Sequence, residues 1–221
     1  LLLLENESMQ QPQTNALLAL MCYNASRFNS RTNTDGDIVL YKDQDRTLWD
    51  KGLIIRGSYY LSLASAGTIA STYHVEAAIA SHYCLAPSFK ATGWKEIYSL
   101  YELLEKINPS PIVQLNKAIV LAYKGNVDKA IQDVLAISGL EQNHLYFAVL
   151  GDLYAMRGET LKAIQHYENA LTIIKNPKQK KLYPELIEVI NQSNNISLDI
   201  NKDIKETLNK ADCVICINST V

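Results

Sequence analysis

The sequence predicts an all-α protein in which helix pairs stack into a right-handed α-solenoid. Apolar residues return every three or four positions through most of the chain, which is the period of an amphipathic helix. The central part also repeats itself, because Gly125 and Gly158 are 33 residues apart and so are Ala130 and Ala163. Proline and glycine fall where helices begin and end. One stretch departs from this pattern, a short irregular acidic segment near the N-terminus.

Composition limits the class of protein. The chain has 221 residues, of which 48% are hydrophobic and 20% charged, so it can bury a sizeable core as soluble proteins do. Its net charge of −2 does not favour nucleic-acid binding. No apolar run approaches the ~20 residues that span a membrane, and residues 1–4 lack the basic flank of a signal peptide. We therefore expect no membrane association. The chain starts without Met inside a helical pattern, which predicts a missing upstream part.

The four cysteines predict a reducing compartment rather than a metal site. Cys22 and Cys84 lie among apolar helix residues, where a free thiol behaves as a small hydrophobe. Cys213 and Cys216 form a lone C-x-x-C, whereas a zinc site needs four ligands and no second pair exists. The better interpretation is an apolar tail. We expect a cytoplasmic protein with no metal and no cofactor.

The acidic segment, residues 35–50, follows a helix predicted over residues 15–27. It opens with the turn Asp35-Gly36-Asp37, in which glycine supplies positive φ and the aspartates cap backbone amides. Residues 38–41 are a short β-prone run. Thr47 and Asp50 then fit a capping box, which predicts a helix over residues 47–66.

The acidic segment has two open interpretations: a well-capped loop that leads into a core helix, or a partner-binding surface. Calcium binding is disfavoured. Aligning Gly36 with the glycine of an EF-hand loop places Arg31 and Lys42 at the first and last ligand positions, where carboxylates are required.

Helices alternate with brief breaks after residue 72. The pattern predicts helices over residues 73–85 and 94–107. Ser110 can cap the next helix and Pro111 suits its first position. Residues 175–181 carry four lysines without interleaved aromatics, which favours a solvated loop over a nucleic-acid contact.

The repeated part resembles the tetratricopeptide repeat. Its second copy contains Gly151, Tyr154, Gly158, Ala163 and Tyr167 at that repeat's spacing, in which small residues sit where two helices cross. Residues 111–139 are a more degenerate copy, and residues 73–109 a third, distorted one. Turns are expected near Gly125 and Gly158, and a closing helix over residues 182–190. The predicted domains are residues 1–71, 72–190 and 191–221.

Motifs that would carry catalysis are thin, so the sequence predicts that the protein is not an enzyme. There is no nucleophile elbow, phosphate-binding glycine loop or dinucleotide fingerprint. Paired carboxylates occur only in the acidic segment, where they are expected to cap backbone amides. Nothing there predicts the raised carboxyl pKa that a catalytic acid needs.

Several motifs together resemble the C-terminal extension of a subgroup of bacterial extracytoplasmic-function sigma factors. They are residues 16–21, 35–37, 43–50, 77–80, 109–111 and 115–118, with His82 and Trp94, in the same order over residues 1–190. The resemblance implies transcription initiation at specific promoters by RNA polymerase. The promoter-reading and polymerase-clamping regions of that family are absent here, so DNA would be reached only through missing regions.

The resemblance implies that the chain acts by binding protein: its own sigma regions in cis, or RNA polymerase or a regulator in trans. The expected interface combines exposed charge with an aromatic anchor: Asp37, Gln44, Asp45, Arg46, Trp49 and Asp50. Arg46 is expected to pair with the neighbouring carboxylates while the Trp49 ring packs inward. Two alternatives are a free-standing repeat scaffold that binds a peptide and, least favoured, a hydrolase that uses the acidic segment.

Overall fold

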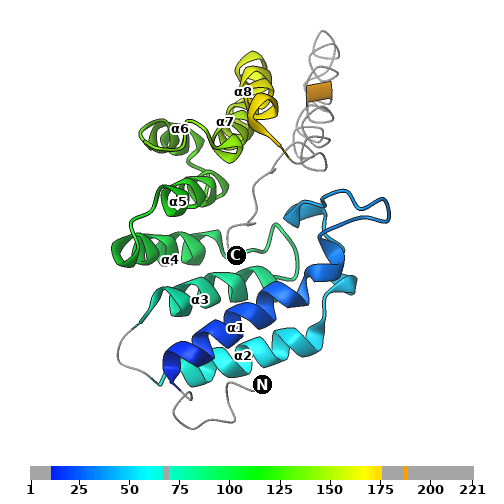
Figure 1. Cartoon of the computed structure of the whole chain (residues 1–221), viewed down its shortest axis with the longest axis vertical. Helices are drawn as coiled ribbons and strands as arrows, with labels where there is room; N and C mark the ends of the chain where they lie inside the picture. The colour runs from blue at the N-terminus through cyan, green and yellow to red at the C-terminus, as the bar shows by residue number, and fades with distance from the viewer. Residues whose placement is uncertain (1–10, 67–69, 176–186, 189–221) are drawn as a thin grey trace. The chain divides into compact units, whose positions relative to one another are not determined.

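The computed structural model describes residues 11–66, 70–175 and 187–188 (Figure 1). Within these ranges the named elements are eight α-helices and three short 3-10 helices. An isolated antiparallel bridge between Thr32 and Ile38 is the only β-type pairing among the described residues. The all-α prediction is confirmed, and the helix-pair arrangement is repeat-like. None of the described helices has the length and apolarity to cross a membrane.

The chain divides into two compact units. Unit 1 comprises Leu1–Arg31 and Gln44–Pro109, and unit 2 comprises Thr32–Asp43 and Ser110–Val221. The domain boundaries that the sequence predicts after residues 71 and 190 stay a prediction.

Unit 1 contains α1 (Pro12–Ser26), α2 (Lys51–Ala64), α3 (Thr72–Leu85) and α4 (Trp94–Ile107). α1 packs along α2 and α3, and α3 packs on α4 (Figure 1). The predicted helices over residues 15–27, 73–85 and 94–107 therefore exist, with ends that differ by a few residues at most.

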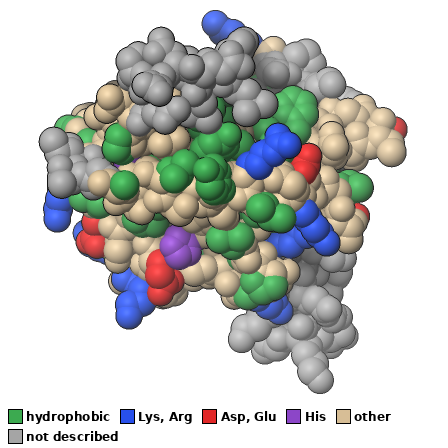
Figure 2. Space-filling model, turned by 90° about the horizontal axis from the view of Figure 1, so that it is seen from below, with side chains coloured by type: hydrophobic (Ala, Val, Ile, Leu, Met, Phe, Trp, Pro, Cys, Tyr) green, Lys and Arg blue, Asp and Glu red, His purple; other side chains and the backbone are tan. Residues whose placement is uncertain are grey.

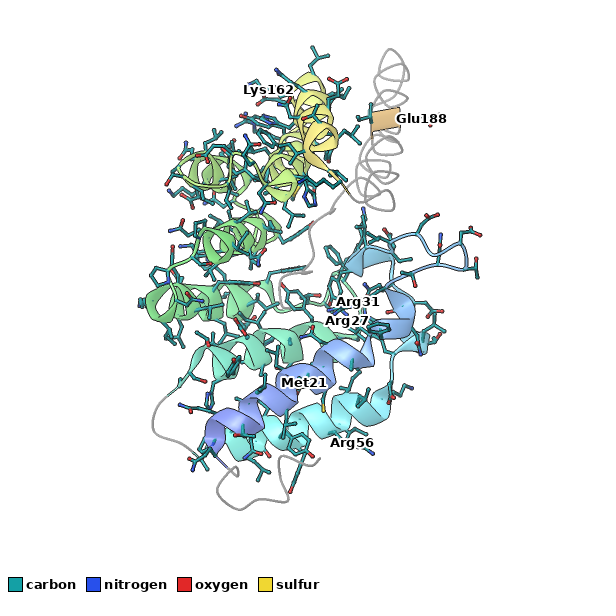
Figure 3. The ribbon with its side chains drawn as sticks, viewed as in Figure 1. Met21, Arg27, Arg31, Arg56, Lys162 and Glu188 are labelled. Atoms are coloured by element: carbon teal, nitrogen blue, oxygen red, sulfur yellow. The ribbon has the colours of Figure 1, made fainter. Side chains whose placement is uncertain are left out.

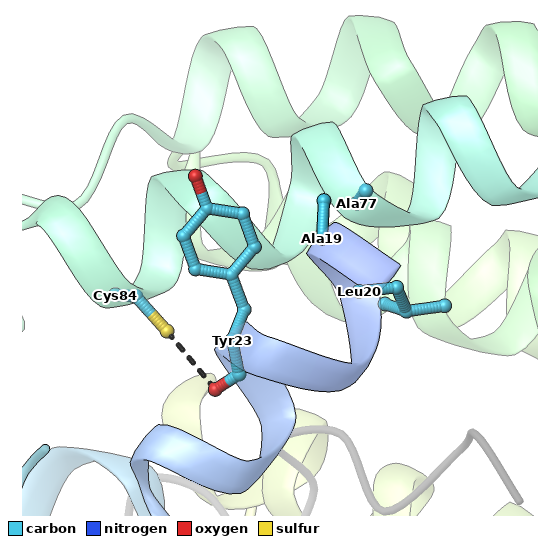
Figure 4. Close-up of a cluster of buried hydrophobic side chains, with 5 residues drawn as sticks. All are labelled: Ala19, Leu20, Tyr23, Ala77 and Cys84. Carbon is cyan, nitrogen blue, oxygen red and sulfur yellow. Dashed lines mark hydrogen bonds between the residues drawn. The ribbon is translucent and has the colours of Figure 1, made fainter. Parts of the chain in front are cut away.

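The core of unit 1 uses small residues to bring helices close. Ala19 and Ala77 are fully buried, and Tyr23 packs between their helices and α2 (Figure 4). A Cβ on Gly57 would lie 2.9 Å from the Tyr23 ring, so glycine is what lets α2 approach. The Tyr23 carbonyl accepts a hydrogen bond from the Cys84 thiol at 3.5 Å. Burial raises the pKa of the Cys84 thiol, which keeps it protonated and inert.

Unit 2 contains α5 (Pro111–Tyr123), α6 (Val127–Leu135), α7 (His144–Met156) and α8 (Thr160–Ile173). They pack as two pairs, α5 with α6 and α7 with α8 (Figure 1). The Ser110 hydroxyl accepts a hydrogen bond from the Val113 N–H at 3.2 Å, and Pro111 occupies the first turn, as predicted.

Both predicted turns are confirmed, and they share one chemistry. Gly125 and Gly158 have φ of 101° and 84°, the left-handed region that favours glycine. In each case the residue after the glycine donates its N–H five residues back, Asn126 to Leu121 at 3.1 Å and Glu159 to Tyr154 at 2.9 Å. This Schellman arrangement satisfies helix carbonyls that would otherwise lack partners.

The crossing of α7 and α8 depends on Gly151 and Tyr167. The Tyr167 side chain is fully buried against the α7 backbone, and its hydroxyl donates a 2.5 Å hydrogen bond to the buried Asp152 carboxyl group. Repeat-type small residues at the crossing were predicted, and the close approach at Gly151 is their physical basis.

Two local predictions are wrong. Thr47 does not start a helix: α2 begins after Asp50, and a 3-10 helix, η5 (Arg46–Leu48), precedes it. The β-prone run over residues 38–41 makes only the isolated bridge at Ile38 and ends in the 3-10 helix η4 (Tyr41–Asp43). The predicted lysine-rich loop after Lys175, the closing helix apart from residues 187–188, and the Cys213/Cys216 tail lie outside the described residues.

Candidate protein-interaction site

The part of the acidic segment that belongs to unit 1, residues 44–50, is built around two capping carboxylates. Asp45 accepts hydrogen bonds from the N–H of Thr47 at 2.8 Å and from its hydroxyl at 2.7 Å. These bonds hold the pKa of the Asp45 carboxyl below its ordinary value. Asp50 accepts from the Leu53 N–H at 2.9 Å and so caps α2. Because Asp45 already holds the Thr47 hydroxyl, the predicted capping box at Thr47 does not form.

Trp49 packs inward as expected, with 5% of its surface exposed. The guanidinium carbons of Arg46 and Arg27 lie 4.9 and 5.5 Å from its ring centroid. Both distances are within reach of a cation–π interaction, which strengthens as the cation loses water. Trp49 therefore fixes two arginines beneath the surface of this segment.

Gln44 is buried, at 6% exposure, whereas the sequence analysis placed it on an exposed interface. Its Oε1 accepts hydrogen bonds from Arg27 Nε at 3.1 Å and from the Ser30 hydroxyl at 3.3 Å. Gln44 thus ties the segment to the end of α1 and is not accessible to a partner.

Arg46 makes one contact that the sequence did not predict. Its Nε donates to the Ala86 carbonyl, just past the end of α3, at 3.3 Å. The expected pairing of Arg46 with Asp43, Asp45 and Asp50 stays a prediction. The carboxylates of Asp45 and Asp50 accept hydrogen bonds from backbone amides, and the bond from Arg46 to Ala86 anchors the segment to a neighbouring helix end.

Asp37 belongs to the unit 2 part of the segment and lies in a tight turn. Gly36 has φ of 76°, as predicted. The side-chain oxygen of Asn33 accepts hydrogen bonds from the N–H groups of Asp35 at 3.0 Å and Asp37 at 2.8 Å. The expected capping by the aspartate side chains stays a prediction. The Asp37 side chain is half-buried.

Sequence reasoning missed the residues beneath the segment. Arg27 is 3% exposed, and Ser26 accepts a hydrogen bond from the Asp50 N–H at 2.8 Å through its carbonyl. Arg31 lies nearby, bonded to Asn24, and burial together with the charge of Arg27 lowers its pKa (Figure 3). No sequence signal separated Arg27 from a solvated loop, since its bond to Gln44 joins residues 17 positions apart.

What residues 44–50 expose is an acidic surface with one apolar side chain. Asp45, Thr47 and Asp50 are exposed, and Leu48 is 51% exposed between them. An apolar side chain ringed by polar groups on a rigid base suits a protein contact. Among the described residues no group of three or more His, Cys, Asp or Glu side chains could hold a metal ion.

Comparisons with known proteins found a family model that matches part of the chain and a curated relative. Residues 1–65, which include most of this site, match a family described as "Family of unknown function (DUF6596)". The chain is 29% identical over 170 residues to an uncharacterized protein of Rhizobium meliloti (strain 1021). That alignment covers 76% of this chain and 40% of the relative, so the chain spans less than half the length of the curated relative it matches. Among solved structures none matches significantly.

Proposed function

We propose that this chain is the C-terminal regulatory and protein-interaction domain of a bacterial extracytoplasmic-function sigma factor, acting with RNA polymerase in the cytoplasm. The domain is non-catalytic, and its helix pairs continue into a right-handed solenoid. The family resemblance of residues 1–190 carries the transcription assignment. The exposed acidic surface of residues 44–50, with Leu48 at its centre and a buried base beneath it, is the structural observation that supports a protein contact.

Pre-organisation is the physical reason to place a contact there. The exposed carboxylates of Asp45 and Asp50 are each fixed by hydrogen bonds to backbone N–H groups. Their base is held by the buried Trp49 and by the Arg46 bond to Ala86. A surface already fixed in one conformation loses little entropy on binding, which favours affinity. The partner is the sigma regions of the same protein or a subunit of RNA polymerase.

The test removes charge without removing the caps. Asp45→Asn and Asp50→Asn keep a side-chain oxygen for the same backbone amides, and Asn caps helices as well as Asp does. Leu48→Ser removes the exposed apolar group. In full-length protein reconstituted with RNA polymerase, the three substitutions together should reduce promoter-dependent transcription while the thermal melt stays unchanged.

A matched control is Leu161→Ser in unit 2, because Leu161 is 82% exposed and outside this site. Normal transcription by the triple variant would refute the interface. The DNA upstream of the codon for Leu1 tests the broader assignment: a reading frame without sigma regions would refute it.

A second candidate is a free-standing scaffold that binds a peptide through the helix pairs of unit 2. The repeat-type turns at Gly125 and Gly158 favour it. The same upstream sequence separates the two functions, since a scaffold needs no sigma regions.

A further inference from the structure

The helix α2 exposes an apolar face that the described residues of unit 1 do not cover. Only Gly57 and Ala64 of its residues are buried. Ile55, Tyr59 and Leu63 recur at intervals of four and are 69%, 59% and 39% exposed. Residues four apart lie on one side of a helix, so these three form a continuous stripe. A surface helix normally shows charged and polar groups to water, which makes this stripe an exception.

Two cations border the stripe, and one carboxylate, Asp50, precedes it as the cap of α2. Lys51 continues the same row of residues by one turn, and Arg56 lies one turn before Tyr59; both are exposed. Neither α1 nor α2 contains an Asp or Glu. Figure 2 looks onto the lower end of Figure 1, where these helices lie, and shows hydrophobic side chains exposed among lysines and arginines, with acidic side chains and a histidine on the same face. Arg56 is labelled in Figure 3.

We propose that the stripe of α2, residues 51–63, is a docking surface for an acidic amphipathic helix of a second protein. The stripe is about 18 Å long at 1.5 Å per residue, the length of a partner helix of three to four turns. Apolar side chains of that helix would pack on Ile55, Tyr59 and Leu63. Its flanking carboxylates would meet Lys51 and Arg56, so charge complementarity selects the partner.

The same charges disfavour two other occupants. A second copy of this chain would bring α2 against α2, and neither helix contains a carboxylate to meet Lys51 and Arg56. Asp50, which precedes each helix, already accepts a hydrogen bond from the Leu53 N–H. An anionic membrane surface binds helices whose polar face is rich in Lys and Arg, and α2 offers two such residues. The inference goes beyond the proposed function, because this surface is distinct from residues 44–50 and its test involves no transcription.

The experiment measures binding of a synthetic peptide to the whole chain by fluorescence anisotropy. The probe is a labelled helical peptide of about 18 residues with a leucine stripe flanked by glutamates, and the comparison peptide carries lysines at the flanks. We expect the glutamate peptide to bind at least about ten-fold tighter than the lysine peptide, and the difference to shrink in about 1 M NaCl.

Three variants connect binding to the stripe. Tyr59→Ser should weaken the glutamate peptide by about ten-fold, as for an aromatic anchor. Arg56→Glu should weaken the glutamate peptide and strengthen the lysine peptide, a reversal that unfolding cannot produce. Leu161→Ser, an equally exposed change in unit 2, should leave both peptides unaffected. Because Tyr59, Arg56 and Leu161 are exposed, all three variants should melt like the parent chain.

Any of four results would overturn the proposal. The first is that the glutamate peptide fails to bind at about 1 mM, and the second is that Tyr59→Ser leaves its binding unchanged. The third is that the chain forms a dimer which Ile55→Ser abolishes, because a second copy would then be the occupant. The fourth is that the chain sediments with anionic phospholipid vesicles and Tyr59→Ser releases it, because the face would then be a membrane contact.

Discussion

Gly151 offers a direct test of how the second helix pair of unit 2 is held together. A Cβ at this position would lie 2.5 and 2.6 Å from two ring carbons of Tyr167, whereas carbon atoms pack at about 3.5–4.0 Å. Tyr167 is fully buried, and its hydroxyl is bonded to Asp152. The ring therefore cannot turn aside without breaking that hydrogen bond.

The expected cost of Gly151→Ala follows from three contributions. Overpacking of a core costs about 1–3 kcal/mol. Weakening the buried Tyr167–Asp152 hydrogen bond costs about 1–3 kcal/mol more. Alanine is favoured over glycine inside a helix by about 0.5–1 kcal/mol, which offsets part of the loss. The free energy of unfolding should fall by about 1–5 kcal/mol.

Urea unfolding followed by circular dichroism measures this change. Gly52→Ala is the matched control: it is also a glycine in a helix, but its new Cβ would meet only the Asp50 carboxylate, at 3.2 Å. It should destabilise the chain by no more than about 0.5 kcal/mol, and the helix preference of alanine can raise stability by up to about 1 kcal/mol. In a Tyr167→Ala background the clash disappears, so adding Gly151→Ala should cost nothing. A Gly151→Ala variant as stable as the parent, or an equal cost in both backgrounds, would refute the packing argument.

Four further predictions follow from the described contacts. Trp49→Ala should lower the free energy of unfolding by about 3–5 kcal/mol in urea titrations, since the ring is buried; a loss below about 1 kcal/mol would contradict this. Gln44→Ala should cost about 1–3 kcal/mol because it removes the acceptor of the buried 3.1 Å hydrogen bond from Arg27 Nε, and a neutral result would contradict the burial of Gln44. Burial lowers the pKa of His166 from 6.5 in the folded state, so the unfolded state takes up the proton first as pH falls. The free energy of unfolding should therefore decline as pH falls below 6.5 toward the lowered pKa. In unfolding experiments at several pH values, His166→Phe should make that decline smaller. Metal analysis of the purified chain should find no stoichiometric zinc or calcium, and one tightly held zinc per chain would revive Cys213 and Cys216 as ligands.

The parts of the fold that the sequence predicted are those in which one residue type has a local reason to be where it is. Gly125 and Gly158 end helices because few other residues adopt their φ. Ser110 followed by Pro111 starts a helix by capping and by a fixed φ, whatever the helix packs against. Trp94–Ile107 was placed to the residue because a glycine precedes it and Asn108 with a proline follows. Such signals act over a few residues and need no tertiary information.

The site escaped prediction where two local solutions competed. Thr47 and Asp50 both satisfy the chemistry of a helix cap, and the sequence pattern favoured the earlier one. The choice depends on Asp45, which binds the Thr47 hydroxyl and N–H and so turns Arg46–Leu48 into a 3-10 helix. Gln44 illustrates the second limit: a polar residue in a charged stretch reads as exposed, and only its distant partner Arg27 makes it buried.

Asp50 links the two surfaces of unit 1. Its carboxylate begins α2, and its own N–H is bonded to the carbonyl of Ser26 at the end of α1. Leu48 and the α2 stripe that starts at Lys51 therefore lie on either side of Asp50, whose side chain and backbone N–H are both held by hydrogen bonds. Because the acidic surface that ends at Asp50 and the cationic stripe after it carry opposite charge, a partner surface of a single charge sign cannot match both. If both proposals hold, unit 1 contacts two chemically different partners, and a charge reversal at Arg56 should leave transcription contacts at residues 44–50 intact.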